Sequence, residues 1–146
     1  MAKRRRPSPK PDHLAEWRAR INAAGARGEA RLLEHATAAY VLVAQDDGQN
    51  GIDTYTLGMG HAVEVAGLAH SIAAWLATDS GIIVDHTDAP RANAVGATCR
   101  EFSGLADHGL ILVPAKADGT EVYAAHWGSE LVVHEVVKAL ARQTTN

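Results

Sequence analysis

The chain has 146 residues, 47% hydrophobic and 21% charged, a composition typical of a globular protein with a sizeable core. A single cysteine excludes an intrachain disulfide and favours a reducing compartment. Glu64 and His70 interrupt the best apolar run, so we expect no membrane span and a soluble, cytoplasmic protein. The net charge of −3 conceals a division: residues 1–31 contain nine Lys/Arg and three Asp/Glu, whereas residues 32–146 contain five and fourteen.

Residues 1–12 are predicted to form a disordered, basic, proline-rich arm, because prolines at every second position forbid a helix. Its cations could follow a phosphate backbone, and the absence of aromatic side chains makes any nucleic-acid binding independent of sequence. Two alternatives remain open: the arm pairs with an acidic surface of this protein or of a partner, or it is merely solvated. The predicted nucleic-acid-binding residues are Lys3, Arg4, Arg5, Arg6 and Lys10.

Residues 13–146 are expected to form a single α+β domain. Asp12 is a candidate cap for a helix from His13, with apolar residues along one stripe. The glycines of Gly25–Gly28 are predicted to break or kink this helix, leaving a second helical piece from Glu29 to about Ala38.

Two hairpins and two apolar helices are expected next. Strands Tyr40–Gln45 and Ile52–Leu57 flank a turn with DG and NG signals, and His61–Ala77 is predicted to be the central, most buried helix. Ser129 is a favourable N-cap for the last helix, Glu130–Arg142. Between these come a possible short strand at Gly81–Val84, a loop at Asp85–Asn93, a weak helix at Ala94–Asp107, and strands Leu110–Val113 and Thr120–His126.

The chain repeats itself at an offset of 68 residues. Residues 41–74 align with 109–142 without a gap and share six identities, which predicts pseudo-repeats at about 29–77 and 97–142. Two such hairpin–helix units would form one mainly antiparallel sheet of four to five strands with helices packed on one face. This order is broadly similar to a tandem CBS pair, a family that binds adenosyl ligands between its repeats. The family's Ser/Thr-x-x-Asp motif is missing, since Leu-Gly-Met follows Thr56.

The repeat also suggests a ligand site. A glycine turn precedes each hairpin-linked helix, and free N–H groups at a helix start can bind an anion. If a dyad relates the halves, the two helix starts could flank one cleft, although glycines that simply turn a strand into a helix explain the same pattern. The cleft residues would be Gly58, Gly60, His61, His126, Gly128 and Ser129.

Other chemistry finds little support in the sequence. No metal-ligand spacing is present; the segment from Asp85 to Asp88 could hold a cation weakly, and Asp46–Leu57 matches an EF-hand loop only in part. Cys99 beside Arg100 could be a nucleophile, but a lone cysteine in an Ala/Gly-rich stretch is usually a small buried hydrophobe. We therefore predict no catalytic residue, metal or cofactor.

The leading interpretation is a non-enzymatic binding or assembly protein whose arm contacts nucleic acid or an acidic partner surface. The alternative is a small-molecule sensor, nucleotide-like in its ligand, that uses the cleft between the repeats. An enzyme of unknown chemistry is the third hypothesis. A protein partner or self-association also remains open, because a hairpin at the edge of a sheet invites pairing.

Overall fold

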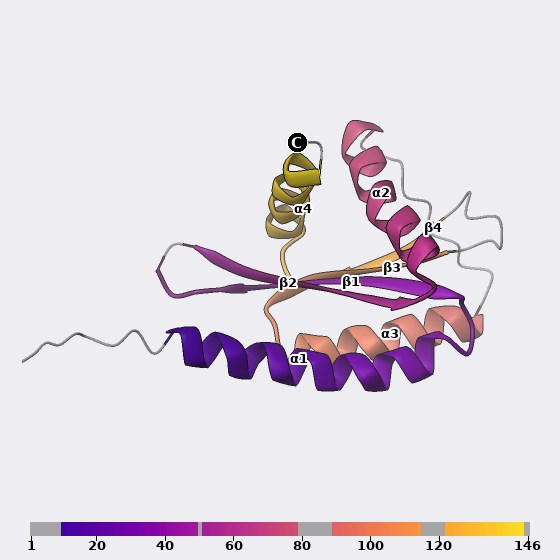
Figure 1. Ribbon diagram of the computed structural model, residues 1–146, viewed down its shortest axis with the longest axis horizontal. Helices are drawn as coiled ribbons and strands as arrows, with labels where there is room; N and C mark the ends of the chain where they lie inside the picture. The colour runs from indigo at the N-terminus through magenta and orange to yellow at the C-terminus, as the bar shows by residue number, and fades with distance from the viewer. Residues whose placement is uncertain (1–9, 50, 79–88, 115–121, 145–146) are drawn as a thin grey trace, which may run out of the picture.

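The computed structural model describes residues 10–49, 51–78, 89–114 and 122–144. These residues form four helices and a four-stranded antiparallel sheet in the strand order β2-β1-β3-β4 (Figure 1). In chain order the elements are α1 (Lys10–Leu32), β1 (Ala38–Asp46), β2 (Ile52–Gly60), α2 (Ala62–Thr78), α3 (Ala89–Ser103), β3 (His108–Pro114), β4 (Val122–Trp127) and α4 (Glu130–Thr144). The predicted α+β class and antiparallel sheet are confirmed. The short strand expected at Gly81–Val84 lies outside the described residues.

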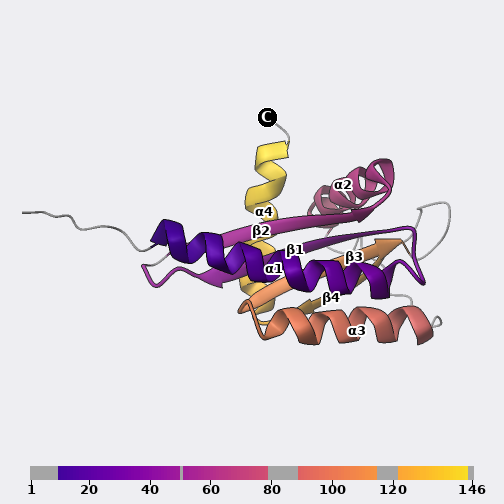
Figure 2. The ribbon, with the colours of Figure 1, turned by 60° about the horizontal axis from the view of Figure 1, so that its bottom comes forward.

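Helices cover both faces of the sheet, so the predicted packing on one face was wrong. Helices α1 and α3 lie side by side against one face, and α2 and α4 stand on the other (Figures 1 and 2). The cause is visible in β1, where Val41 and Val43 belong to the core beside α1 and α3 while Leu42 and Ala44 belong to the core beside α2 and α4. Because side chains alternate across a strand, an apolar residue at every position needs a cover on both faces.

Helix α1 is continuous through Gly25–Gly28, contrary to the predicted break, and it begins at Lys10, earlier than expected. The two glycines allow close approach. A Cβ added at Gly25 would lie 2.8 Å from Leu57 Cδ1, and one added at Gly28 would lie 3.0 Å from Thr98 Cγ2. The glycine seam therefore lets α1 pack tightly on β2 and α3, and this packing offsets the low helix propensity of glycine.

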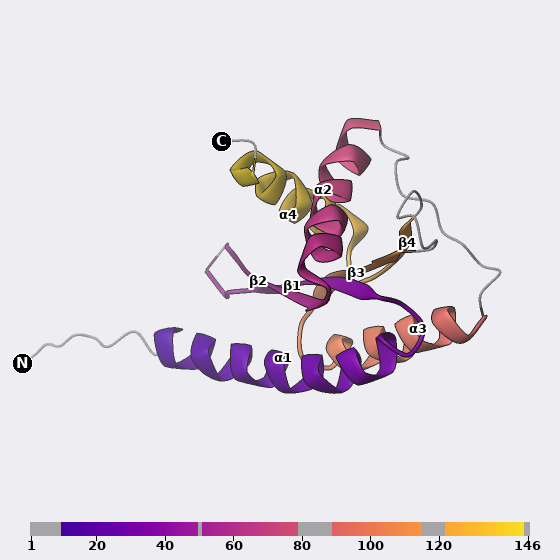
Figure 3. The ribbon, with the colours of Figure 1, turned by 45° about the vertical axis from the view of Figure 1, so that its right-hand side comes forward.

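The prediction that α2 is the most buried helix is not supported by its described side chains, residues 62–70, among which only Leu68 is buried. Helix α2 rises steeply from the sheet, as α4 does (Figures 1 and 3), and Val63 in its first turn is 85% exposed. Helix α1 buries more of its described side chains, since Trp17, Ile21, Ala24 and Leu32 are all at most 2% exposed. A helix that lies along a sheet, as α1 does, can bury a whole stripe of apolar side chains.

The remaining elements match the expectations with shifted boundaries. Helix α3 begins at Ala89 rather than Ala94, so it includes Pro90 from the expected loop; a proline in the first turn of a helix costs no hydrogen bond. The predicted N-cap of α4 is confirmed, because Ser129 Oγ accepts a hydrogen bond of 3.3 Å from the Val132 N–H. No described helix is both long and apolar enough to cross a bilayer.

Candidate functional site

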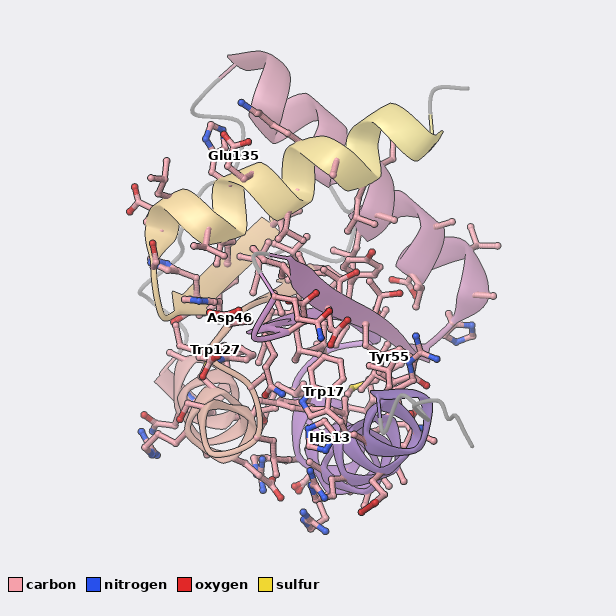
Figure 4. The ribbon with its side chains drawn as sticks, turned by 90° about the vertical axis from the view of Figure 1, so that its left-hand side faces the viewer. His13, Trp17, Asp46, Tyr55, Trp127 and Glu135 are labelled. Atoms are coloured by element: carbon pink, nitrogen blue, oxygen red, sulfur yellow. The ribbon has the colours of Figure 1, made fainter. Side chains whose placement is uncertain are left out.

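A stripe of arginines on α1 sits on a firmly anchored helix. The Trp17 indole N–H donates a 2.8 Å hydrogen bond to the Leu105 carbonyl, which fixes α1 to the end of α3. Arg18, Arg20 and Arg27 of α1 are exposed. Arg20 and Arg27 lie on the flank of α1 toward α3, and Arg18 lies on the other flank, toward β2. Figure 4 shows Trp17 and Tyr55 on the α1 side of the sheet and Glu135 on α4, on the other side.

Arg18 is held in place by the edge of the sheet. Its guanidinium lies 5.5 Å from the centroid of the Tyr55 ring, a cation–π distance. The Tyr55 hydroxyl donates a 3.1 Å hydrogen bond to Asn22 Oδ1, one helical turn further along α1. A positioned but solvent-exposed cation can meet a phosphate with little loss of side-chain entropy.

The two arginines nearest α3 share one carboxylate. Arg27 forms an ion pair with Glu101, and Arg31 Nη2 lies 3.3 Å from Glu101 Oε1. Arg31 Nη1 also donates a 2.9 Å hydrogen bond to Thr98 Oγ1, which in turn donates to the Ala94 carbonyl. Glu101 therefore ties α1 to α3 and neutralises part of their positive charge, but two cations face one anion.

The charge of the two layers differs. Helix α1 has five Lys/Arg and three Asp/Glu, and α3 has two and one. Helix α2 has no Lys or Arg and one Glu, whereas α4 has two of each sign. Among the described helices, the layer of α1 and α3 therefore has the net positive charge, and we call it the basic side.

Of the predicted nucleic-acid-binding residues, Lys3, Arg4, Arg5 and Arg6 lie outside the described residues. Lys10 is the first residue of α1, so the predictions of disorder through residue 12 and of a cap at Asp12 were wrong, and residues 1–9, called the arm below, directly precede the basic helix in the chain. The prediction from the arm alone missed the helix arginines. Their signal was the spacing of Arg20, Arg27 and Arg31, because steps of seven and four residues place side chains along one side of a helix.

The structure does not bring the predicted cleft residues together. Gly60 pairs with Ala38 at the start of β1, whereas Trp127 pairs with Gly109, which itself pairs with Val43 near the end of β1. The two helix starts are therefore separated by about 16 Å along the strands and about 14 Å across them. Gly58, Gly60 and His61 lie at one end of the sheet, and His126, Gly128 and Ser129 lie at the other.

Each helix start has its own local explanation. At the first, a Cβ on Gly58 would lie 2.7 Å from Val65 Cγ1, so Gly58 makes room for α2. At the second, the Ser129 N–H donates a 2.9 Å hydrogen bond to His108 Nδ1. That N–H is one of those an anion would use, and His108 already occupies it.

The carboxylates of the β1–β2 turn bond to backbone groups. Asp46 Oδ1 accepts from the Gly48 N–H at 2.9 Å, and Asp47 Oδ1 accepts from the Gln49 and Gly51 N–H groups at 2.7 and 3.0 Å. A hairpin turn accounts for these residues. The segment from Asp85 to Asp88 lies outside the described residues, within which no group of three or more potential metal ligands gathers.

Cys99 lies half-buried against the core between α1, α3 and the sheet. Burial raises the pKa of its thiol to about 11, although the neighbouring Arg100 acts in the opposite direction. A thiol with so high a pKa is protonated at neutral pH and is a poor nucleophile. The environment of Cys99 therefore matches the small buried hydrophobe among the two sequence-based interpretations.

Comparisons with protein-family models, with curated proteins and with solved structures found no match for this chain.

Proposed function

We propose that this protein is a non-enzymatic binding protein that holds nucleic acid against its basic side, using the arm together with α1. The carrying observation is the division of charge between the two helical layers, since α1 and α3 hold an excess of cations and α2 holds none. The arm adds four further cations directly before α1. An excess of cations on one side of a protein is an electrostatic pattern expected for phosphate-backbone binding.

The geometry favours backbone contact over base recognition. The positioned cations are arginines on one exposed helix, and the Tyr55 ring, which could stack on a base, is engaged with Arg18 and Asn22. Binding should therefore be insensitive to sequence and steeply dependent on salt. The acidic remainder of the chain would limit indiscriminate adhesion and orient the basic side toward the polyanion.

We also infer that the chain arose by duplication, and two observations support this. At an offset of 68, Gly60 corresponds to Gly128, and both have a positive φ, 89° and 81°. In the pairing of β1 with β3, Leu42 faces its own equivalent, Leu110. A dyad between the central strands requires one residue to face its own equivalent. The arm and Arg18, Arg20 and Arg27 of α1 precede the first repeat, so most of the α1 cations lie outside the duplicated part of the chain.

Fluorescence anisotropy with a generic DNA duplex over a salt series tests the function. Each phosphate contact contributes about −0.9 to the slope of log K against log salt, so deleting residues 1–9, with their four cations, should reduce the slope by about 3 to 4. Arg20→Gln on α1 should weaken binding, and the matched Lys138→Gln on α4 should not.

Failure to bind duplex at low salt by the full chain would reject the nucleic-acid function. Arm-dependent binding to polyglutamate in the same experiment would then assign the arm to an acidic protein surface. Equal weakening by Arg20→Gln and Lys138→Gln would show that net charge alone matters and that the basic side is not the site.

A further inference from the structure

Strand β2 is an edge strand with little of the usual protection within the described part of the chain. It pairs with β1 over nine consecutive residues, and no described strand lies on its outer side (Figure 2). Its sequence contains no proline and no lysine, its register has no bulge, and Asp53 is its single charged residue. Natural sheets normally protect an edge of this length with one of those devices, since it otherwise recruits another strand.

The hydrogen-bond pattern shows which groups β2 offers. The Asp47 N–H donates to the Gly51 carbonyl at 3.0 Å, so this pair is a hydrogen-bonded pair of the antiparallel ladder. Hydrogen-bonded and non-hydrogen-bonded pairs alternate, so the odd residues of β2 bond to β1 and the even ones direct their N–H and C=O groups outward. The outward residues are Ile52, Thr54, Thr56, Gly58 and Gly60.

The two ends of β2 differ on the face that bears α2. At the Gly60 end α2 begins, and its Val65 packs against Gly58. At the other end the Ile52 side chain is 43% exposed. Val63, in the first turn of α2, is 85% exposed. The Ile52 end of β2 thus has a partly exposed apolar side chain, and at the Gly60 end α2 presents an exposed apolar side chain, Val63.

We propose that β2 pairs antiparallel with β2 of a second copy of this chain about a two-fold axis at Thr56, which makes one eight-stranded sheet. This register places Ile52 opposite Gly60 of the second copy, where the partner's α2 begins with its exposed Val63. The outward backbone groups gain partners, and each uncovered end lies beside a covered one. Asp53 faces Met59 of the second copy in this register, so no two like charges lie opposite each other across the pair of β2 strands.

The opposite face of the sheet agrees with the same axis. Asn22 bonds to Tyr55 and Gly25 lies against Leu57, so the level of Thr56 falls midway between Asn22 and Gly25 on α1. A two-fold axis at that level brings Arg18 of one copy beside Glu29 of the other, twice. Both are exposed and lie on the flank of α1 that points away from α3. The axis was chosen from the pairing of β2 alone, yet it also brings Arg18 and Glu29 together. This charge complementarity favours a second copy of the chain as the partner of β2.

Cysteine cross-linking of the full chain tests the register. Only the residue on the two-fold axis faces itself, at a Cα separation of about 5.5 Å that a disulfide can span. Thr56→Cys should therefore form a dimer of twice 15.4 kDa under mild oxidation, and Ile52→Cys, on the same strand and face, should not. Cross-linking by Ile52→Cys but not Thr56→Cys would overturn the register.

Sedimentation of the full chain over a concentration series tests the association itself. The wild-type chain should dimerise, and Thr54→Pro should abolish the dimer because it removes an outward N–H, whereas the matched His126→Pro on edge strand β4 should not. Arg18→Glu and Glu29→Arg should each raise the dimer Kd about tenfold or more, and the double variant should restore it. A wild-type monomer at all concentrations, or a double variant no better than either single one, would overturn the proposal.

Discussion

Gly60 lies at the junction between β2 and α2, and its substitution tests what this junction requires. Its φ is +89°, and a Cβ at this position would lie 2.3 Å from the Thr37 carbonyl oxygen. Gly48 has nearly the same φ, +81°, but nothing lies within 4 Å of its added Cβ. The two positions therefore separate backbone strain from steric conflict.

The expected losses follow from these contacts. Alanine in the left-handed region costs about 1–2 kcal/mol at either position. At Gly60 the carbonyl must also move by about 1 Å, and such overpacking adds about 1–3 kcal/mol. We expect Gly48→Ala to lose about 1 kcal/mol of unfolding free energy and Gly60→Ala about 3 kcal/mol. The gain from a stiffer unfolded chain is common to both variants and leaves their difference unchanged.

Urea denaturation followed by far-UV circular dichroism measures both losses. With a slope of about 2 kcal/mol per molar, the midpoint should fall by about 0.5 M for Gly48→Ala and about 1.5 M for Gly60→Ala. Gly128→Ala, whose Cβ would lie 2.3 Å from the Asp107 carbonyl oxygen, should match Gly60→Ala. Equal losses at Gly48 and Gly60 would refute the steric part of the reasoning.

Three further changes probe the core. Trp17→Phe should lower the unfolding free energy by about 2 kcal/mol in the same assay, because the Leu105 carbonyl loses its donor. A loss below about 0.5 kcal/mol, the lower end for one hydrogen bond, would show that water replaces the indole. Ile111→Ala at the fully buried centre of the sheet should cost about 2–5 kcal/mol, and a smaller loss would mean that both layers collapse into the cavity. Cys99 should react with iodoacetamide at pH 8 roughly 100-fold more slowly than a free cysteine, since its pKa is about 11 against a model value of 9.0. Because this raised pKa keeps the folded thiol protonated while the unfolded one ionises, stability should fall between pH 9 and 11; a rise in that window would contradict the shift.

The sequence predicted the local features well, because their causes are local. The turn residues after Asp46 specify a hairpin, and Ser129 specifies the start of α4; both are confirmed. The unbroken apolar run Val41–Ala44 also contained the signal for helices on both faces, but the prediction placed them on one. Such a run cannot alternate between core and solvent, so it needs two covers.

The missed features depend on residues far apart in the chain. Glycine within a helix indicates either a break or a close approach, and only the position of Leu57 and Thr98 shows that Gly25 and Gly28 serve the latter. The pairing of Arg31 with Glu101 joins residues 70 positions apart, and no local pattern predicts it. The separation of the two helix starts likewise depends on the strand order, since β2 and β4 are the two edges of the sheet and the helices that follow them start at opposite ends of it.

The short connection between α3 and β3 is held from two sides by tryptophans. Trp17, on α1, donates its indole N–H to the Leu105 carbonyl. Trp127, on β4, donates its indole N–H to the Ala106 carbonyl in a 3.1 Å hydrogen bond. Trp127 also stacks on Phe102, with ring centroids 6.1 Å apart. Two of the chain's three tryptophans, one near each end of the sequence, therefore contact the connection between α3 and β3. Their emission is a built-in optical probe that would reveal whether the first and last thirds of the chain separate together or one after the other.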